Sequence, residues 1–327
     1  MLAVVTGASG HVGANLVREL LAQKRKVRCL VREDTQALKG LKVEMIKGDV
    51  RDPESLMKLL KGAETVFHCA AKISIVGSQN GLVEDTNIQG VKNVVEACLK
   101  NRVKRLVHVS SIHAFNTRPD NEVIDEKRPL VLEDNHPAYD KSKANGQMAV
   151  LDGVKRGLNA VIVHPTGVIG PNDFKVSRMG SVILDLYHGR IPALVDGGYN
   201  WVDARDVVSG ILAAEKKGRK GENYLLSGHW GHMLELASMI TKITGKKTPK
   251  FMTPVWLAHF VSYFSLAAGK IKNEIPKFTP EAMIAIKKHR YISHQKATDE
   301  LGYNHRPFEE TLRDTLAWFG KMGMLKK

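Results

Sequence analysis

The sequence predicts an α/β fold: a doubly wound parallel sheet carrying a smaller, discontinuous, mostly helical lobe. Two observations predict it. Short apolar runs alternate with amphipathic stretches through the first half of the chain, in the order of a parallel sheet with crossover helices. The apolar runs are continuous in Val, Ile and Leu instead of alternating with polar residues, which is typical of strands buried on both faces.

The alternation can be followed element by element from the amino end. The expected strands are LAVVTG, KVRCLVR, VEMIKGDV, TVFHCAA and VKRLVHVSS. The expected helices are VGANLVRELLAQ, ESLMKLL and NIQGVKNVVEACLKN. Two later apolar runs, NAVIVHPTGVIG and ENYLLSG, are expected to add strands to the same sheet.

The length of 327 residues favours two lobes. We expect residues 1–165 and about 201–228 to form a nucleotide-binding domain. Residues about 166–200 and 229–327 are expected to form a substrate-binding lobe, because their helical patterns are interrupted by Pro and Gly.

Composition is that of a globular protein, with 43% apolar and 25% charged residues. The net charge is +15, and residues 215–327 hold 20 Lys and Arg against 10 Asp and Glu. We interpret this surplus as solvated surface, with an acidic ligand or a membrane surface as the alternative. No nucleic-acid-binding motif accompanies it, so no nucleic-acid partner is predicted.

The longest apolar segment, Val255–Ala268, is shorter than the ~20 residues that a membrane-spanning helix needs. It is expected to be a buried or amphipathic helix, and peripheral membrane contact is left open. No leader pattern follows Met1, so a cytoplasmic location is expected. Cys29, Cys69 and Cys98 lie in apolar runs and are expected to be reduced, and the histidines show no metal-ligand spacing, so no metal is predicted.

The segment TGASGHVG follows the first apolar run and precedes the first amphipathic stretch. Gly7 would allow a tight turn, Gly10 a close approach of the backbone to a pyrophosphate, and Gly13 the packing of helix against strand. The helix amino terminus would face the anion. The pattern predicts a Rossmann dinucleotide site. The other loop residues expected to line it are Ser9, His11 and Val12.

The end of the second strand, LVRED, bears on the choice of cofactor. A carboxylate there would bind a ribose 2′-hydroxyl, whereas a cation would bind a 2′-phosphate. Val31 stands where the acid is expected, and Arg32 follows it. Glu33 and Asp34 could still turn inward, and Arg32 could instead be a solvated surface residue. We expect NADP(H) in preference to NAD(H).

A further acidic residue is expected near the adenine. Asp49 of GDVRD follows the third strand, where its carboxylate could accept a hydrogen bond from the adenine amine, and Val50 would lie beside it. The alternative is an aspartate that caps a helix or closes a turn.

The segment PAYDKSK places Tyr139 and Lys143 four residues apart, on one face of a helix that Pro137 can open. An ammonium beside a phenol favours the phenolate, so we expect Lys143 to lower the pKa of Tyr139. The alternative is an amphipathic helix with a solvated lysine.

Taken together, TGASGHVG, HCAA at 68–71, VSS at 109–111 and Tyr139-x-x-x-Lys143 resemble the extended short-chain dehydrogenase/reductases of the NAD-dependent epimerase/dehydratase superfamily. HPTGVIGPND and WVDARDVVSGI resemble later motifs of that superfamily. ATDELGYNHRPFEETLRDTLAWF is similar to the carboxyl-terminal end of its dihydroflavonol reductase and 3β-hydroxysteroid dehydrogenase branch. The resemblance spans nearly the whole chain.

The resemblance implies that Ser111, Tyr139 and Lys143 form the catalytic unit, with Asn87 supporting a proton-relay water. Tyr139 would act as general acid or base, Ser111 would bind the substrate oxygen, and Lys143 would hold the nicotinamide ribose. Ser110 is the rival for the role of Ser111, and a helix cap is the alternative for Asn87. The resemblance also implies a set of residues that line the cofactor, namely Cys69, Ala70, Ala71, Tyr139, Lys143, Pro165, Thr166 and Val168.

The expected function is that of an NADPH-dependent ketone reductase or alcohol dehydrogenase acting on a mid-sized, hydrophobic ring compound. The alternatives are an NAD-retaining nucleotide-sugar epimerase or dehydratase, and a cofactor-sensing regulatory protein without catalysis. His164 replaces an arginine of the sugar-nucleotide enzymes, and IHAFN replaces their Tyr-Gly ending, which disfavours a nucleotide sugar. A small-molecule substrate is expected, and a homodimer paired through two long helices is left open.

Overall fold

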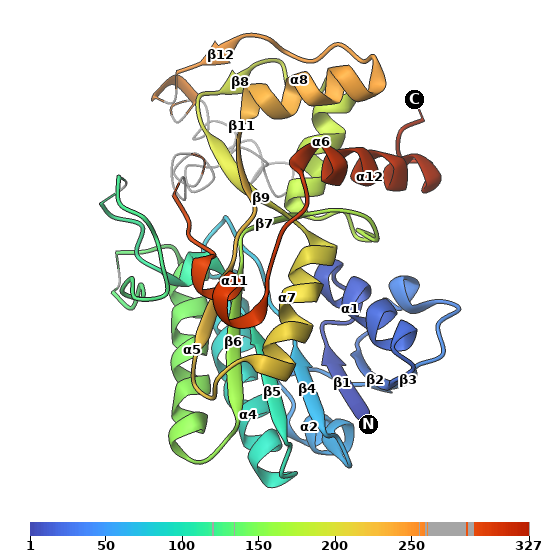
Figure 1. Cartoon of the computed structure of the whole chain (residues 1–327), viewed down its shortest axis with the longest axis vertical. Helices are drawn as coiled ribbons and strands as arrows, with labels where there is room; N and C mark the ends of the chain where they lie inside the picture. Colours follow the sequence, from blue (N-terminus) through green and yellow to red (C-terminus); the bar gives the residue numbers. More distant parts are fainter. Residues whose placement is uncertain are drawn as a thin grey trace.

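The computed structural model of the chain describes residues 1–119, 121–133, 135–254, 256–258, 260, 286 and 291–326. Its larger lobe contains a seven-stranded sheet in the order β10–β6–β5–β4–β1–β2–β3, with all neighbouring strands parallel (Figure 1). The doubly wound parallel sheet is therefore confirmed, including the two later strands. The strands are β1 (Leu2–Thr6), β2 (Lys26–Val31), β3 (Glu44–Lys47), β4 (Thr65–His68), β5 (Arg105–Val109), β6 (Ala160–Pro165) and β10 (Asn223–Leu226).

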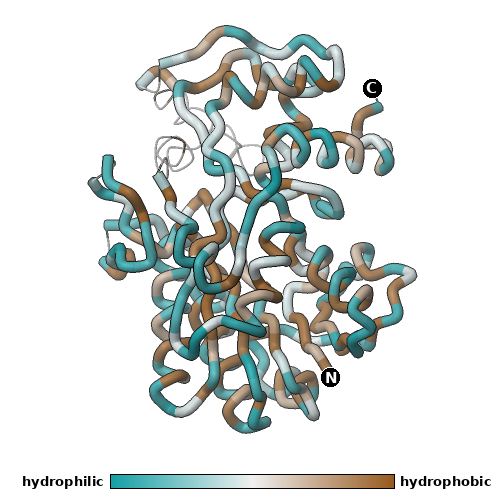
Figure 2. The backbone as a smooth tube through the Cα atoms, in the orientation of Figure 1, coloured by the Kyte–Doolittle hydropathy of each residue, from teal (hydrophilic) through white to brown (hydrophobic). Residues whose placement is uncertain are grey.

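Helices cover both faces of this sheet, and each face has its own hydrophobic core. On one face lie α1 (His11–Ala22), α7 (Ala204–Lys217) and α11 (Gln295–Leu301). On the other lie α2 (Pro53–Leu60), α4 (Gly90–Lys100) and α5 (Ala138–Lys155). Figure 2 shows the hydrophobic stretches concentrated along the central strands between these layers. Burial on both faces explains why the strands read as continuous apolar runs.

The chain runs outward from β1 in both directions along the sheet, toward β3 on one side and toward β10 on the other. The strand order therefore reverses between β1 and β4. In doubly wound sheets the crevice at such a reversal, outside the carboxyl ends of the strands, is where ligands bind. The short helix α3 (Leu82–Glu84) and a π-helical turn, Asp85–Gln89, lead from β4 into α4 at this edge.

The smaller lobe contains short strands. The expectation that all of NAVIVHPTGVIG belongs to the large sheet is wrong for Gly167–Ile169, which pairs with residues 201–203, and the other short strands were not predicted. β7 (Gly167–Ile169), β9 (Gly198–Asp203) and β11 (His229–His232) form a three-stranded sheet, and β8 (Leu194–Val195) pairs with β12 (Met252–Thr253). Its helices are α6 (Arg178–Tyr187), α8 (Met233–Thr244) and α12 (Phe308–Lys321). The predicted domain boundaries stay a prediction.

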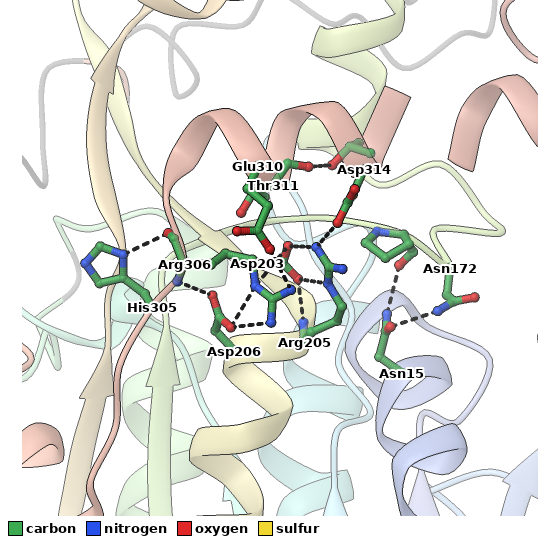
Figure 3. A network of polar contacts seen from close by, with 12 residues as sticks. Asn15, Asn172, Asp203, Arg205, Asp206, His305, Arg306, Glu310, Thr311 and Asp314 are labelled. Atoms are coloured by element: carbon green, nitrogen blue, oxygen red, sulfur yellow. Dashed lines mark hydrogen bonds and ion pairs between the residues drawn. The ribbon is translucent and has the colours of Figure 1, made fainter. Parts of the chain in front are cut away.

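An ionic network joins the two lobes where β9 leads into α7 (Figure 3). Asp203 has 1% of its surface exposed and accepts hydrogen bonds from the backbone amide and the guanidinium of Arg205, at 2.8, 2.9 and 2.7 Å. Arg306, which precedes α12, donates to Asp206 at 2.7 and 2.9 Å and lies 3.7 Å from Asp203. Arg205 also pairs with Asp314 of α12 at 2.7 Å. The network therefore fixes α12 to the start of α7.

Within the described ranges, no helix is both long enough and apolar enough to cross a membrane. Most of the apolar stretch 255–268, for which a helix is predicted, lies outside the described residues. The three cysteines are free thiols. Cys29 and Cys98 are buried, whereas Cys69, directly after β4, is partly exposed.

Candidate active site

The glycine-rich loop lies at the carboxyl end of β1, in contact with the end of β4. Gly7 adopts φ +72°, and a Cβ there would lie 2.6 Å from the backbone nitrogen of Ala70. A Cβ at Gly13 would lie 2.2 Å from the carbonyl oxygen of Gly7. The amide of Gly10 donates to that same oxygen at 3.0 Å. The loop therefore leaves no room for side chains between β1, α1 and β4.

This loop fits a pyrophosphate. α1 begins after Gly10, no side chain caps its amino end, and its first turn contains no acidic residue. Backbone amides at an uncapped helix start bind phosphate oxygens well, because they are unpaired and the helix dipole favours negative charge. The residues present thus match the dinucleotide site that the sequence predicts.

The remaining residues of the loop are held in place by the second strand and by the smaller lobe. Ser9 donates a hydrogen bond to the carbonyl of Asp34 at 2.7 Å. The Nε2 atom of His11 lies 3.0 Å from the carbonyl oxygen of Pro171, to which Asn15 donates at 2.9 Å. Val12 packs against the core of the sheet. The contacts of Asn15 and Pro171 are absent from the sequence analysis, because they join segments more than 150 positions apart.

At the end of β2, the strand ends at Val31 and Arg32 follows with its side chain 71% exposed. The guanidinium of Arg32 lies 3.9 Å from a carboxylate oxygen of Asp49. The carboxylate of Asp34 forms an ion pair with Lys175 of the smaller lobe, at 3.1 Å. The amide of Gln36 and the charge of Lys175 lower the pKa of Asp34.

Asp49 is engaged by a second guanidinium that the sequence analysis does not use. Arg51 donates to both carboxylate oxygens at 3.0 Å and through its backbone amide at 2.9 Å, which lowers the pKa of Asp49. Asp52, and not Asp49, is the residue that caps α2, and the adenine contact of Asp49 stays a prediction. Arg32 and Arg51 both flank the carboxylate of Asp49.

The predicted lining residues lie at the ends of β4 and β6. Cys69 and Ala70 are partly exposed and Ala71 is exposed, directly beside the glycine loop. Pro165 ends β6, and the hydroxyl of Thr166 donates to Asn200 at 2.8 Å. Val168 lies in β7 and packs on the core beneath α1, whereas Val50 is buried on the opposite face of the sheet.

The two residues expected to hold the reacting oxygen are in contact. The side chain of Ser111 lies near enough to the phenol of Tyr139, in the first turn of α5, to lower its pKa. Ser110 is 4% exposed, and its hydroxyl has no hydrogen-bond partner within the described residues. The structure therefore brings Ser111, and not its rival, to Tyr139.

The expectation that Lys143 lowers the pKa of Tyr139 is wrong for the ligand-free protein. Burial raises the pKa of Tyr139 to about 12, and Asp140 acts in the same direction. The side chain of Ser111 and the charge of Arg178 lower it only partly. The free-energy cost of removing a phenolate from water is larger than the stabilisation that Ser111 and Arg178 provide. The phenol therefore stays protonated at neutral pH.

The ammonium of Lys143 lies at the carboxyl end of β5, where it donates to the carbonyl oxygen of Val109 at 3.0 Å. Lys143 is 4% exposed. Burial lowers its pKa from 10.5 to about 8, while the nearby thiol of Cys69 acts in the opposite direction. The amine is thus enclosed at the ends of the central strands. Its partner Val109 is the last residue of β5 and stands two residues before Ser111.

Asn87 does not cap a helix, and its proposed support of a proton-relay water stays a prediction. It lies in the π-helical turn before α4. Its amide donates to the carbonyl of Lys72 and to the hydroxyl of Ser142, both at 2.9 Å, and its oxygen accepts from the amide of Lys72 at 2.8 Å. Asn87 therefore ties the segment after β4 to α5.

Three buried histidines lie beside Lys143 as a cluster that the sequence analysis does not predict. His68, His108 and His164 lie on the neighbouring strands β4, β5 and β6, with at most 1% of their surface exposed. The rings of His68 and His108 stack 5.2 Å apart. Burial lowers the pKa of His68 and of His164 to about 3, so both are neutral. The signal that the sequence offered for this cluster is that each of the three histidines stands near the carboxyl end of a predicted strand.

Replacing Lys143 with methionine is expected to raise the free energy of unfolding of the ligand-free protein by about 2 kcal/mol at neutral pH. Lowering a pKa from 10.5 to about 8 corresponds to about 3 kcal/mol. Losing the hydrogen bond from Lys143 to Val109 reduces this gain in stability by about 1 kcal/mol. The gain should be complete below pH 8 and fade as the pH approaches 10.5, because the unfolded wild-type amine then also becomes neutral and folding no longer requires it to release a proton.

Denaturant unfolding at several pH values measures this effect. Lys155→Met, which removes an exposed lysine from the last turn of the same helix, is the matched control and should show no gain. A Lys143→Met protein less stable than wild type at neutral pH would contradict the burial penalty.

Comparison with known proteins supports the geometry described above. The NAD dependent epimerase/dehydratase family matches residues 3–227. Sterol demethylase protein B of Methylococcus capsulatus is 33% identical over 99% of this chain and 100% of that protein. A putative dihydroflavonol 4-reductase of Synechocystis is 31% identical over 98% of this chain and 95% of that protein.

The solved structures agree with this assignment. The crystal structure of gox2253 is 32% identical and superposes with a TM-score of 0.87, covering 99% of each chain. UDP-glucuronic acid 4-epimerase from Bacillus cereus shares the fold at 19% identity, with a TM-score of 0.80 over 98% of this chain and 100% of that one. The chain belongs to the NAD dependent epimerase/dehydratase family and is an NAD(P)-dependent oxidoreductase of the extended short-chain dehydrogenase/reductase group.

Proposed function

We propose that the protein is an NADPH-dependent oxidoreductase that interconverts a mid-sized, hydrophobic ring ketone and its alcohol. The observation that carries the proposal is the contact between Ser111 and Tyr139 at the strand ends that adjoin the glycine loop. When bound, the nicotinamide supplies or accepts the hydride. The chain's own residues hold the substrate oxygen and move its proton.

In the direction of reduction, the hydroxyls of Ser111 and Tyr139 both donate hydrogen bonds to the carbonyl oxygen. The phenol then gives its proton to that oxygen as general acid. Its raised pKa suits this role, because the phenol is fully protonated near neutral pH. The ammonium of Lys143 lies at the carboxyl end of β5, where its charge would stabilise the phenolate that remains and bind the cofactor ribose.

The ring character of the substrate is inferred from the relatives. Their names refer to a sterol, a dihydroflavonol and, in a Stigmatella aurantiaca ketoreductase 27% identical over 99% of this chain, a farnesyl dihydroquinoline oxide. The experiment is an assay of NADPH oxidation by the purified protein with decalone, a steroid ketone and a flavanone. Ketone-dependent oxidation supports the proposal, and none with any of the three overturns it.

Replacing Arg32 with alanine is expected to weaken NADPH binding about 10- to 100-fold and to leave NADH binding unchanged. A hydrogen bond to a charged group contributes about 1.5–3 kcal/mol, and only NADPH has a 2′-phosphate for this exposed guanidinium to bind. Quenching or enhancement of the dihydronicotinamide fluorescence measures both affinities. Arg190→Ala, which removes a similarly exposed arginine from the smaller lobe, is the control. Equal losses for both cofactors would contradict the NADP preference.

The nucleotide-sugar alternative has less support from the site. His164, which replaces the expected arginine, is completely buried. Its Nδ1 atom lies 3.1 Å from the carbonyl oxygen of Ser111, and its ring packs against Phe115 at 4.7 Å. A neutral, enclosed imidazole offers no charge to a diphosphate. Copurification of tightly bound NAD, with stabilisation by uridine diphosphate, would favour this alternative.

Three further expectations stay proposals. A homodimer would pair α4 and α5 with their copies, and Met148 of α5 is an exposed apolar residue on that side. Peripheral membrane contact would use the exposed Phe251 and Trp256, next in sequence to the basic run of Lys246, Lys247 and Lys250. The cytoplasmic location rests on the sequence expectation.

A further inference from the structure

The carboxylate of Asp34, in the segment that follows β2, is paired at both of its oxygens. One oxygen accepts a hydrogen bond from the amide of Gln36 at 2.9 Å, and the other lies 3.1 Å from the ammonium of Lys175. The backbone carbonyl of Asp34 accepts a hydrogen bond from Ser9 of the glycine-rich loop at 2.7 Å. Asp34 therefore lies beside the glycine-rich loop, and a lysine of the smaller lobe holds its carboxylate.

Lys175 reaches Asp34 because residues 171–175 cross the start of α1. The carbonyl oxygen of Pro171 accepts a hydrogen bond from Asn15 of α1 at 2.9 Å. The side chain of Asn172 donates to the side-chain oxygen of Asn15 at 2.9 Å, as Figure 3 shows. These contacts bring a lysine of the smaller lobe to the end of β2.

The same segment is fixed on both sides of Lys175. Asp173 is 2% exposed, and both of its carboxylate oxygens accept a hydrogen bond from the amide of Ser177 at 2.8 Å. The guanidinium of Arg18 lies 4.9 Å from the centre of the Phe174 ring. None of these contacts uses the ion pair of Lys175, so the segment should keep its place when that pair is removed.

The charges at the end of β2 oppose one another in cofactor binding. In Rossmann domains a carboxylate here binds the ribose 2′-hydroxyl of NAD, whereas a cation binds the 2′-phosphate of NADP. Arg32, with its side chain 71% exposed, is such a cation, and Asp34 is a carboxylate two residues later. A carboxylate that is paired with an ammonium repels a phosphate less than a free one does. The ion pair with Lys175 therefore favours the same cofactor as Arg32.

We propose that Lys175 is a cofactor-specificity residue, which acts by pairing with the carboxylate of Asp34. The inference rests on the NADPH preference in the proposed function and assigns part of that preference to a residue of the smaller lobe. Lys175 acts through Asp34 and is thus a positioning residue. Without it, the released carboxylate would repel the 2′-phosphate of NADPH and accept a hydrogen bond from the ribose of NADH.

The affinities of variants for the two cofactors test the proposal. Dissociation constants of NADPH and NADH are measured from dihydronicotinamide fluorescence at one ionic strength, because salt screens exposed charges. Lys175→Met is expected to weaken NADPH binding about 10-fold, the order of effect of one unpaired like charge at a partly exposed site. It should tighten NADH binding about threefold, because the ribose hydroxyl then donates to Asp34. Lys175→Arg keeps the ion pair and should retain the wild-type affinities.

A double-mutant cycle with Asp34→Asn separates this pairing from a direct contact of Lys175 with the cofactor. In the Asp34→Asn background, Lys175→Met should change both affinities by less than about twofold, because no carboxylate remains to be released. Lys242→Met, which removes another exposed lysine of the smaller lobe from its ion pair with Glu309, is the matched control and should change neither affinity. The effect of Lys175→Met should persist when the adjacent acid is removed by Glu33→Gln.

A loss of NADPH affinity that persists in the Asp34→Asn background would indicate direct contact with the phosphate and overturns the inference. Equal weakening of both cofactors with a lower melting temperature, the result of a purely structural role, also overturns it. Unchanged affinities in Lys175→Met do the same, and the proposed function stands if wild type prefers NADPH. A wild type that prefers NADH, with an Asp34-dependent effect of Lys175→Met, supports the inference and counts against the NADPH preference. Binding of neither cofactor to wild type overturns both.

Discussion

Replacing Tyr139 with phenylalanine is expected to lower kcat for ketone reduction by about 10²- to 10⁴-fold, the usual contribution of a general acid. The change removes one oxygen atom and keeps the ring that packs against His113. Ser111 would still bind the carbonyl oxygen, but an aliphatic hydroxyl is a much weaker acid than a phenol and would not replace Tyr139 as proton donor. Single-turnover oxidation of NADPH with an excess of enzyme measures the step directly.

Two controls separate chemistry from folding in this experiment. Tyr187→Phe removes a phenol at the far end of α6, beside His188, and should leave kcat unchanged. NADPH affinity should be the same in Tyr139→Phe and wild type, because the glycine loop is untouched. A Tyr139→Phe protein that reduces ketones at the wild-type rate would exclude the tyrosine as the proton donor.

Replacing Asp203 with alanine is expected to lower the free energy of unfolding by about 3–5 kcal/mol, the usual cost of removing one partner from a buried ion pair. Asp203 is almost fully buried, caps α7 and compensates the charges of Arg205 and Arg306. Without it, α7 loses its cap, and Arg205 and Arg306 lose the buried carboxylate between them, although they keep Asp314 and Asp206. Urea denaturation measures the loss.

The exposed pair of Lys242 and Glu309 provides the contrast. Its atoms lie 2.9 Å apart, as close as those of the buried network, but the lysine side chain is 67% exposed. Lys242→Ala should therefore cost less than about 1 kcal/mol. Asp203→Asn, which keeps an oxygen to cap α7, should fall between the two. Equal losses in Asp203→Ala and Lys242→Ala would show that burial does not set the strength of these contacts.

The strands, the glycine loop and the Tyr139–Lys143 spacing could be predicted from the sequence because each depends on residues close together in the chain. A strand buried on both faces must be apolar along its length. A turn with φ +72° at Gly7 favours glycine for local steric reasons. Val31 and Arg32 could be assigned to the end of β2 for the same reason, since a strand ends where its apolar run ends.

The smaller lobe was harder to predict. Its strands are two to six residues long and pair with segments distant in the chain, as β9 does with β7 and β11. Strands this short carry too little periodicity to separate them from loops. The return of α11 to pack on α7 is likewise invisible to local patterns, because the contact depends on where the chain has already gone.

The sequence by itself thus determined which residue types stand at the strand ends and in which order: the glycines, Ser111, Tyr139 and Lys143. The tertiary structure alone decided their protonation and their partners. Burial of Tyr139 raises the pKa of its phenol. Tertiary contacts also pair Lys143 with the carbonyl of Val109, Asp49 with Arg51 and Asp140 with His113. The physical reason is that desolvation and pairing of charges depend on everything that surrounds a group, and most of those neighbours are far away in the chain.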